Sequence, residues 1–345
     1  MEEATNEYQY MVATRCFTYN QAPYIKDALR GFALQETTFP AVYIVVDDAS
    51  NDGEQGILRE WVSQNLMTKE GGIVWQELPY GSLIVAPLKC KPNSTFVILL
   101  LSENHYQTGK NTKRIDYISK WYDNAKYHAL CEGDDYWIDS MKLQKQVSFL
   151  ESHSDYVLTY TDSIVINQNS RKVFHRNPNR FSGNITKELV GRGNFIDTAT
   201  VCYINKDKEW QTVRASIPFK LLMGDKPMWI FYSSLGKIQF FKDKTTVYRL
   251  LPESASHTKD ITKSMAFIDN TAEITRYFNR RYNVGIDESI LEKQFRIAKV
   301  RESAKISRSD FLVLWKKLIL DYPKTILNIR LDIIAVVRII LNRAV

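Results

Sequence analysis

Residues 41–53 read AVYIVVDDASNDG, and this stretch decides the fold class. An apolar run of strand formers at residues 42–46 stops abruptly at Asp47-Asp48, and a helical pattern begins near Gly53. A strand that is apolar along its whole length is typical of a parallel sheet covered on both faces. The stretch therefore predicts one strand–loop–helix unit of an α/β protein.

The sequence on either side repeats this alternation of strands and helices. Residues 11–17 form a short apolar run, and from residue 24 apolar residues recur at the spacing of one helical face. The pattern at residues 113–126 predicts a helix, and residues 127–131 predict a strand. A further helix is predicted to begin near Asp139. Residues 78–112 contain two strand-like runs and predict a hairpin or a lid. We expect a mostly parallel sheet with helices on both of its faces.

The second half of the chain changes in character. Strand-like runs occur at residues 198–204, 237–241 and 245–251, and Asp225-Lys226-Pro227 predicts a helix start because proline is tolerated in a first turn. Beyond residue 254 the periodicity is helical throughout, with segments at 262–281, 287–305 and 308–345. These segments predict a helical C-terminal extension.

Composition limits the classes of partner. The 345 residues include 46 Lys and Arg against 39 Asp and Glu, a net charge of +7. This excess fits an anionic substrate or an anionic membrane surface and is too small to indicate nucleic-acid binding. We expect no secretory signal and no transmembrane helix, because no basic segment precedes an apolar one at the N-terminus and no run of about eighteen apolar residues occurs.

Polar groups follow three of the predicted strands, where ligands of open parallel sheets bind. Each cluster alone fits a turn or a helix cap, but three strands that deliver polar groups to one edge favour a site. The clusters are Thr18-Tyr19-Asn20, Asp47-Asp48 and Asp134-Asp135.

Asp134-Asp135 and Asp225 carry the most specific chemistry. Adjacent carboxylates raise each other's pKa unless a cation lies beside them, and Mg²⁺ or Mn²⁺ needs only one or two protein carboxylates when phosphate and water complete its shell. The pair therefore predicts a metal–diphosphate site. Asp225, at a predicted helix start, is a candidate general base, with a helix cap as the alternative.

These motifs resemble family 2 glycosyltransferases of bacterial polysaccharide biosynthesis over about residues 9 to 256. The similar segments are Thr18-Tyr19-Asn20-Gln21, residues 45–53, Cys131-Glu132-Gly133-Asp134-Asp135-Tyr136-Trp137, residues 223–229 and Val247-Tyr248-Arg249. In related sequences a histidine often follows the Val-Tyr-Arg motif, whereas Leu250-Leu251 stand here and the nearest histidine is His257.

The resemblance implies a GT-A fold, which is a Rossmann-like, mostly parallel sheet with helices on both faces. It places the catalytic domain at residues 1–256, with a nucleotide-binding half to residue 135 and an acceptor half from 136, and the helical extension at 257–345. It implies that Thr18 and Tyr19 bind the nucleotide, with Tyr19 stacked on the nucleobase. Asp48 would hydrogen-bond the base, and Asp134 would hold the ribose or sugar. Asp135 would bind the metal, and Asp225 would take the acceptor proton.

The expected function is transfer of a sugar, with inversion, from a nucleotide-diphosphate donor, with UDP-sugars favoured, to a glycan or lipid-linked acceptor of the cell envelope. The alternative is a catalytically silent subunit that binds nucleotide sugars or serves assembly. Residues 326–345 are apolar almost all round a helix and carry basic residues. A helix of this kind can lie on the inner face of a membrane. The alternative is that it packs against the chain's own catalytic domain or against a second copy of the protein. We expect a cytoplasmic enzyme, peripheral on the membrane in the first case.

Overall fold

The computed structural model describes residues 8–67, 74–173, 180–251 and 260–323. The chain divides into two compact units. The first contains residues 1–185, 194–212 and 235–249, and the second contains residues 186–193, 213–234 and 250–345. The predicted boundary at residue 256, between a catalytic domain and a helical extension, stays a prediction.

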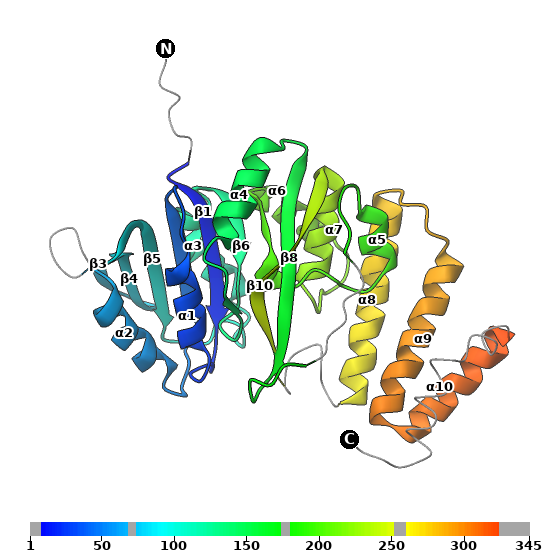
Figure 1. Ribbon diagram of the computed structural model, residues 1–345. Helices are drawn as coiled ribbons and strands as arrows, with labels where there is room; N and C mark the ends of the chain where they lie inside the picture. The colour runs from blue at the N-terminus through cyan, green and yellow to red at the C-terminus, as the bar shows by residue number, and fades with distance from the viewer. Residues whose placement is uncertain (1–7, 68–73, 174–179, 252–259, 324–345) are drawn as a thin grey trace. The chain divides into compact units, whose positions relative to one another are not determined.

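Within the described residues, the first unit is built on one ten-stranded mixed sheet of order β3-β4-β5-β2-β1-β6-β9-β8-β10-β7 (Figure 1). Its centre, β5-β2-β1-β6, is parallel, whereas β3, β4 and β9 pair with antiparallel neighbours. The strands are β1 (Tyr10–Thr18), β2 (Ala41–Asp47), β3 (Val74–Leu78), β4 (Gly81–Leu88), β5 (Lys91–Leu101), β6 (Ala125–Leu130), β7 (Tyr136–Trp137), β8 (Tyr156–Asn167), β9 (Cys202–Ile204) and β10 (Lys237–Leu250).

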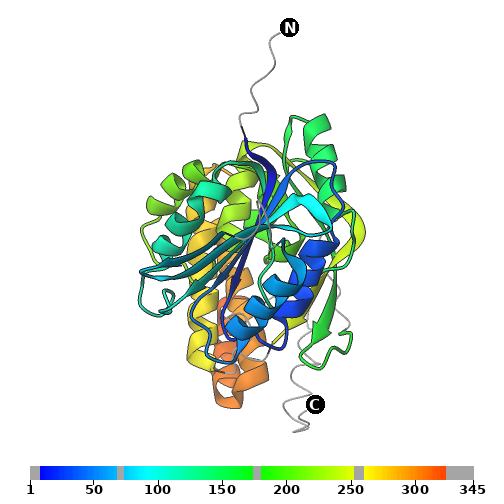
Figure 2. The same cartoon turned by 90° about the vertical axis from the view of Figure 1, so that its left-hand side faces the viewer.

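Helices cover both faces of this sheet, as Figures 1 and 2 show. On one face, α1 (Ile25–Leu34), α2 (Glu54–Asn65) and α4 (Lys142–Ser152) bury apolar side chains against alternate strand residues such as Val12 and Tyr43. On the other face, α3 (Asn111–Tyr122) packs on the intervening residues, such as Ala13 and Val42. Successive strand residues point to opposite faces, so every residue of β2 is buried. The predicted α/β class is confirmed, and the expected parallel pairing holds for the four central strands.

Several predicted boundaries differ from the structure. The predicted hairpin at 78–112 is present as β4 and β5, but it extends the main sheet, and β3, which was not predicted, pairs with its outer edge. Residues 125 and 126, predicted as helix, begin β6, and the predicted strand at 198–204 starts as a 3-10 turn, Thr198–Thr200. The two strands predicted at 237–241 and 245–251 are one continuous strand, β10.

The second unit is helical. It contains α5 (Thr186–Gly191), α7 (Asp225–Leu235), α8 (Ile261–Arg281), α9 (Glu288–Ile306) and α10 (Arg308–Asp321), while α6 (Asp207–Ala215) joins the two units in sequence. The predicted helices at 262–281 and 287–305 are confirmed as α8 and α9, and their starts are capped by the carboxylates of Asp260 and Asp287. Within the described residues no helix is long and apolar enough to cross a membrane. Residues 326–345 lie outside the described residues.

Gly31 gives a test of how α1 meets the sheet edge. A Cβ at this position would lie 2.7 Å from the backbone nitrogen and 2.8 Å from the backbone oxygen of Trp137 in β7. Backbone atoms cannot swing away as a side chain can, so Gly31→Ala should lower the free energy of unfolding by about 1–3 kcal/mol.

The matched control is Gly56→Ala on α2, where an added Cβ meets nothing within 4 Å. Alanine is the better helix former, so this change should raise the free energy of unfolding by about 0.5–1 kcal/mol. Urea denaturation of both variants shows whether each change lowers or raises the free energy of unfolding. Equal effects would mean that α1 does not approach β7 as closely as described.

Candidate functional site

Backbone pairing brings the three polar clusters of the first unit to one edge of the sheet. Thr18 pairs with Asp47 at the end of the β1–β2 ladder, and the N–H of Asp48 donates to the carbonyl of Thr18 at 3.0 Å. On the other side of β1, the N–H of Gly133 donates to the carbonyl of Phe17 at 3.2 Å. The ladders thus continue beyond the strands and place the Asp48 and Asp134-Asp135 loops on either side of Thr18.

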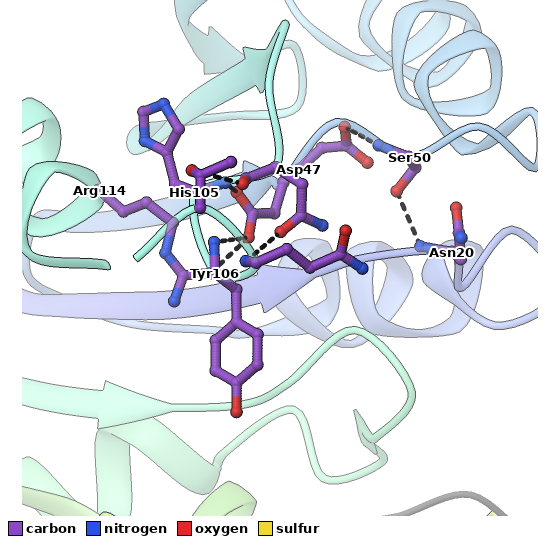
Figure 3. A network of polar contacts seen from close by, with 10 residues as sticks. Asn20, Asp47, Ser50, His105, Tyr106 and Arg114 are labelled. Carbon is purple, nitrogen blue, oxygen red and sulfur yellow. Dashed lines mark hydrogen bonds and ion pairs between the residues drawn. The ribbon is translucent and has the colours of Figure 1, made fainter. Parts of the chain in front are cut away.

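Reciprocal hydrogen bonds tie the loop after β1 to the loop after β2. Asn20, which has a left-handed backbone (φ 54°), donates its N–H to Ser50 Oγ at 2.8 Å and accepts the N–H of Asn51 at 2.9 Å (Figure 3). Asp52 accepts the N–H of Ala22 at 2.9 Å. Asparagine tolerates the left-handed region better than most residues, which suits it to this turn. The two loops are therefore one hydrogen-bonded structure.

A pocket of about 210 Å³ opens beside these loops. Tyr19 is half-buried at its wall, and Tyr106 is 69% exposed. The residues that line it are Phe17, Thr18, Tyr19, Gln21, Asp48, Asn104, Tyr106, Gln107, Arg114 and Glu132. The wall combines aromatic faces with polar groups, a combination suited to a flat heterocycle that carries hydrogen-bonding edges.

Asp48 organises one side of this pocket and is 1% exposed. Its carboxylate accepts the backbone N–H groups of His105 and Tyr106 at 2.8 and 3.0 Å and forms an ion pair with Arg114 at 3.1 Å. Figure 3 shows these amides and the Arg114 guanidinium converging. Asp48 therefore holds the loop after β5 in place, and any base contact that it makes uses lone pairs beyond these three bonds.

Glu132 lines the pocket just before the two aspartates. Burial raises the pKa of its carboxyl to about 7, although the Arg15 and Arg114 guanidiniums favour the charged form. Near neutral pH this group is therefore present both as a hydrogen-bond donor and as an acceptor.

Asp134 and Asp135 form a buried acidic pair. Burial raises the pKa of Asp135 well above its ordinary value, the charge of Asp134 raises it further, and the Arg249 N–H, which donates to Asp135 Oδ1 at 2.9 Å, opposes the shift. Burial also raises the pKa of Asp134, while Arg249 and a hydrogen bond from the Gln21 side chain lower it. Asp197 adds a further negative charge near Asp135.

Arg249 in β10 fixes the position of this pair. Its side chain is 3% exposed, its Nε donates to the carbonyl of Asp134 at 3.0 Å, and its guanidinium pairs with Asp27 at 3.1 Å. The same guanidinium lies over the rings of Tyr24 and Tyr136 at 4.4 and 5.5 Å. The Val-Tyr-Arg motif thus supplies both a backbone donor to Asp135 and a buried cation that holds the loop.

The acidic pair fits a divalent cation of the Mg²⁺ or Mn²⁺ type. Two adjacent carboxylates with raised pKa values are destabilised as anions, and a hard cation relieves this repulsion. In the part of the chain that the structure describes, no group of three His, Cys, Asp or Glu side chains is arranged to hold a metal. The pair therefore suits an ion that takes its remaining ligands from phosphate and water.

Asp225 lies in the second unit as the first residue of α7, as predicted. Its Oδ1 accepts the N–H of Lys226 at 2.8 Å. The Lys226 side chain is 1% exposed, and its Nζ donates to the carbonyl of Arg192 at 2.8 Å and to Thr275 Oγ1 at 3.2 Å. Burial lowers the pKa of Lys226 to about 8, which the negative charge of Asp225 opposes. These contacts fix the start of α7, and the role of Asp225 as a base stays a prediction.

The sequence predicts that Thr18, Tyr19, Asp48, Asp134 and Asp135 lie at one edge of the sheet, and the structure places them there. Arg114, Asp197 and Glu54 are not predicted from the sequence. Arg114 lies on α3 and reaches Asp48 across 66 residues of sequence, so only the fold reveals it. His257, the histidine nearest to the Val-Tyr-Arg motif, lies outside the described residues.

Comparison with known proteins gives relatives without an assigned activity. No family model matches the chain. The uncharacterized proteins Rv1520 of Mycobacterium tuberculosis (strain ATCC 25618 / H37Rv) and Mb1547 of Mycobacterium bovis are each 28% identical to it over 232 residues, which is 67% of this chain and 56% of theirs. The chain thus spans about half the length of the curated relatives that it matches.

Solved structures with a similar backbone fold include two that contain a bound ligand. The S. aureus TarS 1-349 structure in complex with UDP has a TM-score of 0.49 and 14% identity, and the match covers 86% of this chain and 73% of that one. The mannosyltransferase PcManGT from Pyrobaculum calidifontis, in complex with GDP-Man and Mn²⁺, has a TM-score of 0.49 and 12% identity, with coverage of 98% and 89%. Both TM-scores lie below 0.5, so we infer the function from the residues of the site.

Proposed function

We propose that this chain is an inverting glycosyltransferase that uses a nucleotide-diphosphate sugar, with a glycan or lipid-linked acceptor. The observation that carries the proposal is the placement of Tyr19 and Asp48 in one pocket at the carboxyl edge of a parallel sheet. The loop that bears Asp134-Asp135 is bonded to the end of β1 beside this pocket through the Gly133 N–H. The resemblance of these segments to family 2 glycosyltransferases supports the same reading. UDP-sugars are the favoured donors.

Each residue then has a defined task. Tyr19 stacks on the base, Asp48 accepts a hydrogen bond from it, and Asp134 holds the ribose or sugar. Asp135 would hold Mn²⁺ or Mg²⁺, which when bound neutralises charge on the diphosphate. Asp225 accepts the proton of the acceptor hydroxyl as its oxygen bonds to the anomeric carbon and the bond to the diphosphate breaks on the opposite side.

Asp135→Asn tests the metal–diphosphate site. The change keeps the size of the side chain but removes the charge, so kcat/KM for metal-dependent hydrolysis or transfer of a UDP-sugar should fall by at least about a hundredfold. Asp116→Asn, an exposed carboxylate on α3, is the matched control and should behave like the wild type. An unchanged rate for Asp135→Asn would end this assignment.

Asp225→Asn separates the enzyme from its alternative, a silent nucleotide-sugar-binding subunit. If Asp225 is the general base, transfer should fall by about 10²-fold or more while UDP binding, measured by calorimetry with Mn²⁺, stays within about twofold. The alternative predicts that the wild type binds UDP-sugar but neither hydrolyses nor transfers it with any acceptor offered. A transfer rate that survives Asp225→Asn would remove this residue from the mechanism.

We further propose that α10 lies on an anionic membrane surface, which suits a lipid-linked acceptor. Its inner face packs through Phe311 and Leu318, yet its outer face exposes Leu312, Val313 and Leu320 by 50%, 67% and 69%. Lys316 and Lys317 are exposed between these apolar residues. Two lysines on the same face would repel each other across a symmetric dimer, whereas anionic lipid attracts them.

Vesicle co-sedimentation tests this surface. The double variant Val313→Ser/Leu320→Ser should bind vesicles that contain phosphatidylglycerol at least about tenfold more weakly than the wild type, because two apolar anchors are lost. Ile290→Ser on α9 removes an apolar side chain that is also exposed, by 51%, and should have little effect. Binding that does not depend on phosphatidylglycerol, or a dimer that the double variant dissociates, would overturn the proposal.

A further inference from the structure

A second pocket, of about 580 Å³, opens in the second unit between α8 and the loop that follows α6. This volume lies in the range of small-molecule sites, about 300–1,000 Å³. The pocket shares no residue with the one beside Asp48. One of its walls is a single face of α8, because the residues that line it recur at helical spacing. The loop contributes Phe219, and α8 contributes Glu273, Arg276, Tyr277, Arg280 and Arg281.

Phe219 and Tyr277 give this pocket an aromatic surface. Their ring centroids are 6.0 Å apart, and the ring planes are nearly perpendicular, at 87°. Both side chains are half-buried, so each ring leaves part of its surface open to the pocket. Such a surface suits a ring-shaped ligand with an apolar face, and the C–H face of a sugar is one.

Two of the three arginines in the α8 wall are neutralised by carboxylates of the protein. Arg276 forms an ion pair with Glu292. Arg280 donates from Nε and Nη2 to the two carboxylate oxygens of Glu288, at 2.6 and 2.7 Å. Both glutamates belong to α9, so these pairs hold α8 against α9. Neither arginine therefore offers an uncompensated charge to a ligand.

Arg281 has no carboxylate partner in the part of the chain that the structure describes. Its Nη1 donates to the hydroxyls of Ser216 and Tyr277, at 3.2 and 2.9 Å, and both of these partners are neutral. Within the same part of the chain, its Nε and Nη2 donate to no protein atom. These two nitrogens form the edge of a guanidinium that binds both oxygens of a carboxylate or phosphate.

A helix C-terminus offers a simpler reason for an arginine, because the negative end of the helix dipole favours cations in the last turn. Arg281 lies in the last turn of α8. The dipole accounts for a positive charge at this position but not for its orientation. The hydroxyls of Ser216 and Tyr277 hold one nitrogen of the guanidinium at the pocket wall, which a cation that serves only the dipole does not need.

Glu273 gives the pocket a negative end. It lies two turns before Arg281 on the same face of α8, is exposed, and forms no ion pair with any residue that the structure describes. A carboxylate accepts hydrogen bonds from hydroxyl groups and repels a second anion. The wall thus favours a ligand with its acidic group at the Arg281 end and hydroxyl groups at the other.

We propose that this pocket binds one acidic sugar unit. The carboxylate or phosphate of the sugar lies on Arg281, its ring lies against Phe219 and Tyr277, and its hydroxyls point toward Glu273. A free inorganic anion would use only the guanidinium. A lipid phosphate would use the guanidinium and the rings but would place no hydroxyl on Glu273, so the three features together favour a sugar.

The loop of this pocket continues along the chain to Asp225 and is held on α8. Asn270 of α8 accepts the N–H of Leu222 at 2.8 Å and donates to the carbonyl of Lys220 at 2.7 Å. The sugar is therefore bound by the same segment that leads into the start of α7. It is then a unit of the acceptor; this role rests on the proposed function, whereas the binding of an acidic sugar does not.

Ligand-observed NMR titration tests the site without donor or metal. The tighter binder of glucuronic acid and glucose 6-phosphate should bind at least about tenfold more tightly than methyl glucoside or inorganic phosphate, because each of these satisfies only part of the site. Methyl glucoside that binds equally well would refute the role of the charge. Equal binding of inorganic phosphate, or binding of dihexanoyl phosphatidic acid but of neither acidic sugar, would also overturn the proposal.

Arg281→Gln removes the charge but keeps a donor for the two hydroxyls. Its affinity for the acidic sugar should fall at least about tenfold, to that of methyl glucoside. The matched control is Arg301→Gln, which removes an exposed arginine of α9 outside the pocket and should bind like the wild type. Equal losses in the two variants would mean that the sugar responds to net charge alone, and would overturn the site.

Transfer assays separate this inference from the proposed function. With a UDP-sugar as donor, Arg281→Gln should raise KM for an acceptor that ends in glucuronic acid at least about tenfold, and UDP binding should stay within about twofold of the wild type. An unchanged KM would refute the acceptor role. A wild type that binds neither UDP nor GDP would instead refute the proposed function, and the sugar titration would stand by itself.

Discussion

The desolvation of carboxylates at the carboxyl edge of the central sheet constrains everything around the pocket. Asp48, Glu54 and Asp135 are 1%, 0% and 5% exposed, and a buried anion is costly unless it is paired, hydrogen-bonded or neutralised. Each carboxyl meets this constraint differently. Asp48 has two backbone amides and a guanidinium, Glu54 has the Gln21 N–H and the hydroxyls of Thr18 and Ser50, and Asp135 has one amide from β10. The loops take their shape from these requirements.

The same constraint explains why distant segments meet at this edge. The amides that serve Asp48 come from the loop after β5, and the amide that serves Asp135 comes from β10, which begins more than a hundred residues later in the chain. Gly133 comes just before the two aspartates, and a Cβ added there would fall 2.4 Å from both Thr18 Oγ1 and Gln21 Oε1. Only a residue without a side chain allows the two aspartates to approach the loop after β1 this closely.

Local patterns in the sequence were sufficient for the central elements and insufficient for their partners. The apolar run at residues 42–46 and the helical spacing after residue 24 are local signals, and both elements are present as β2 and α1. The pairing of β6 with β9 and the addition of β3 at the edge depend on contacts between remote segments, which periodicity does not report. The sequence pattern predicts a helix at residues 125 and 126, whereas their pairing with β1, a contact between remote segments, makes them part of a strand.

The site shows the same division between local and remote information. Parallel strands deliver their carboxyl ends to one edge, so Thr18, Asp48 and Asp134-Asp135 could be grouped from sequence before any contact was known. Arg114 and Glu54 could not, because an arginine on a helix and a glutamate at a helix start are common on protein surfaces. Their meaning comes from burial against partners 66 and 36 residues away. The role of Asp225 depends on an acceptor and stays a prediction.

The distribution of positive charge in the first unit supports the proposed divalent cation beside the acidic pair. Arg114 is paired with Asp48, and Arg249 is paired with Asp27 and bonded to the carbonyl of Asp134. Both guanidiniums are thus engaged by groups of the protein. A diphosphate placed beside Asp134 and Asp135 would add negative charge to a buried site that already favours protonated carboxyls. Such a ligand can be accommodated there when it brings a cation with it, which is the property that distinguishes a metal–nucleotide complex from the free nucleotide.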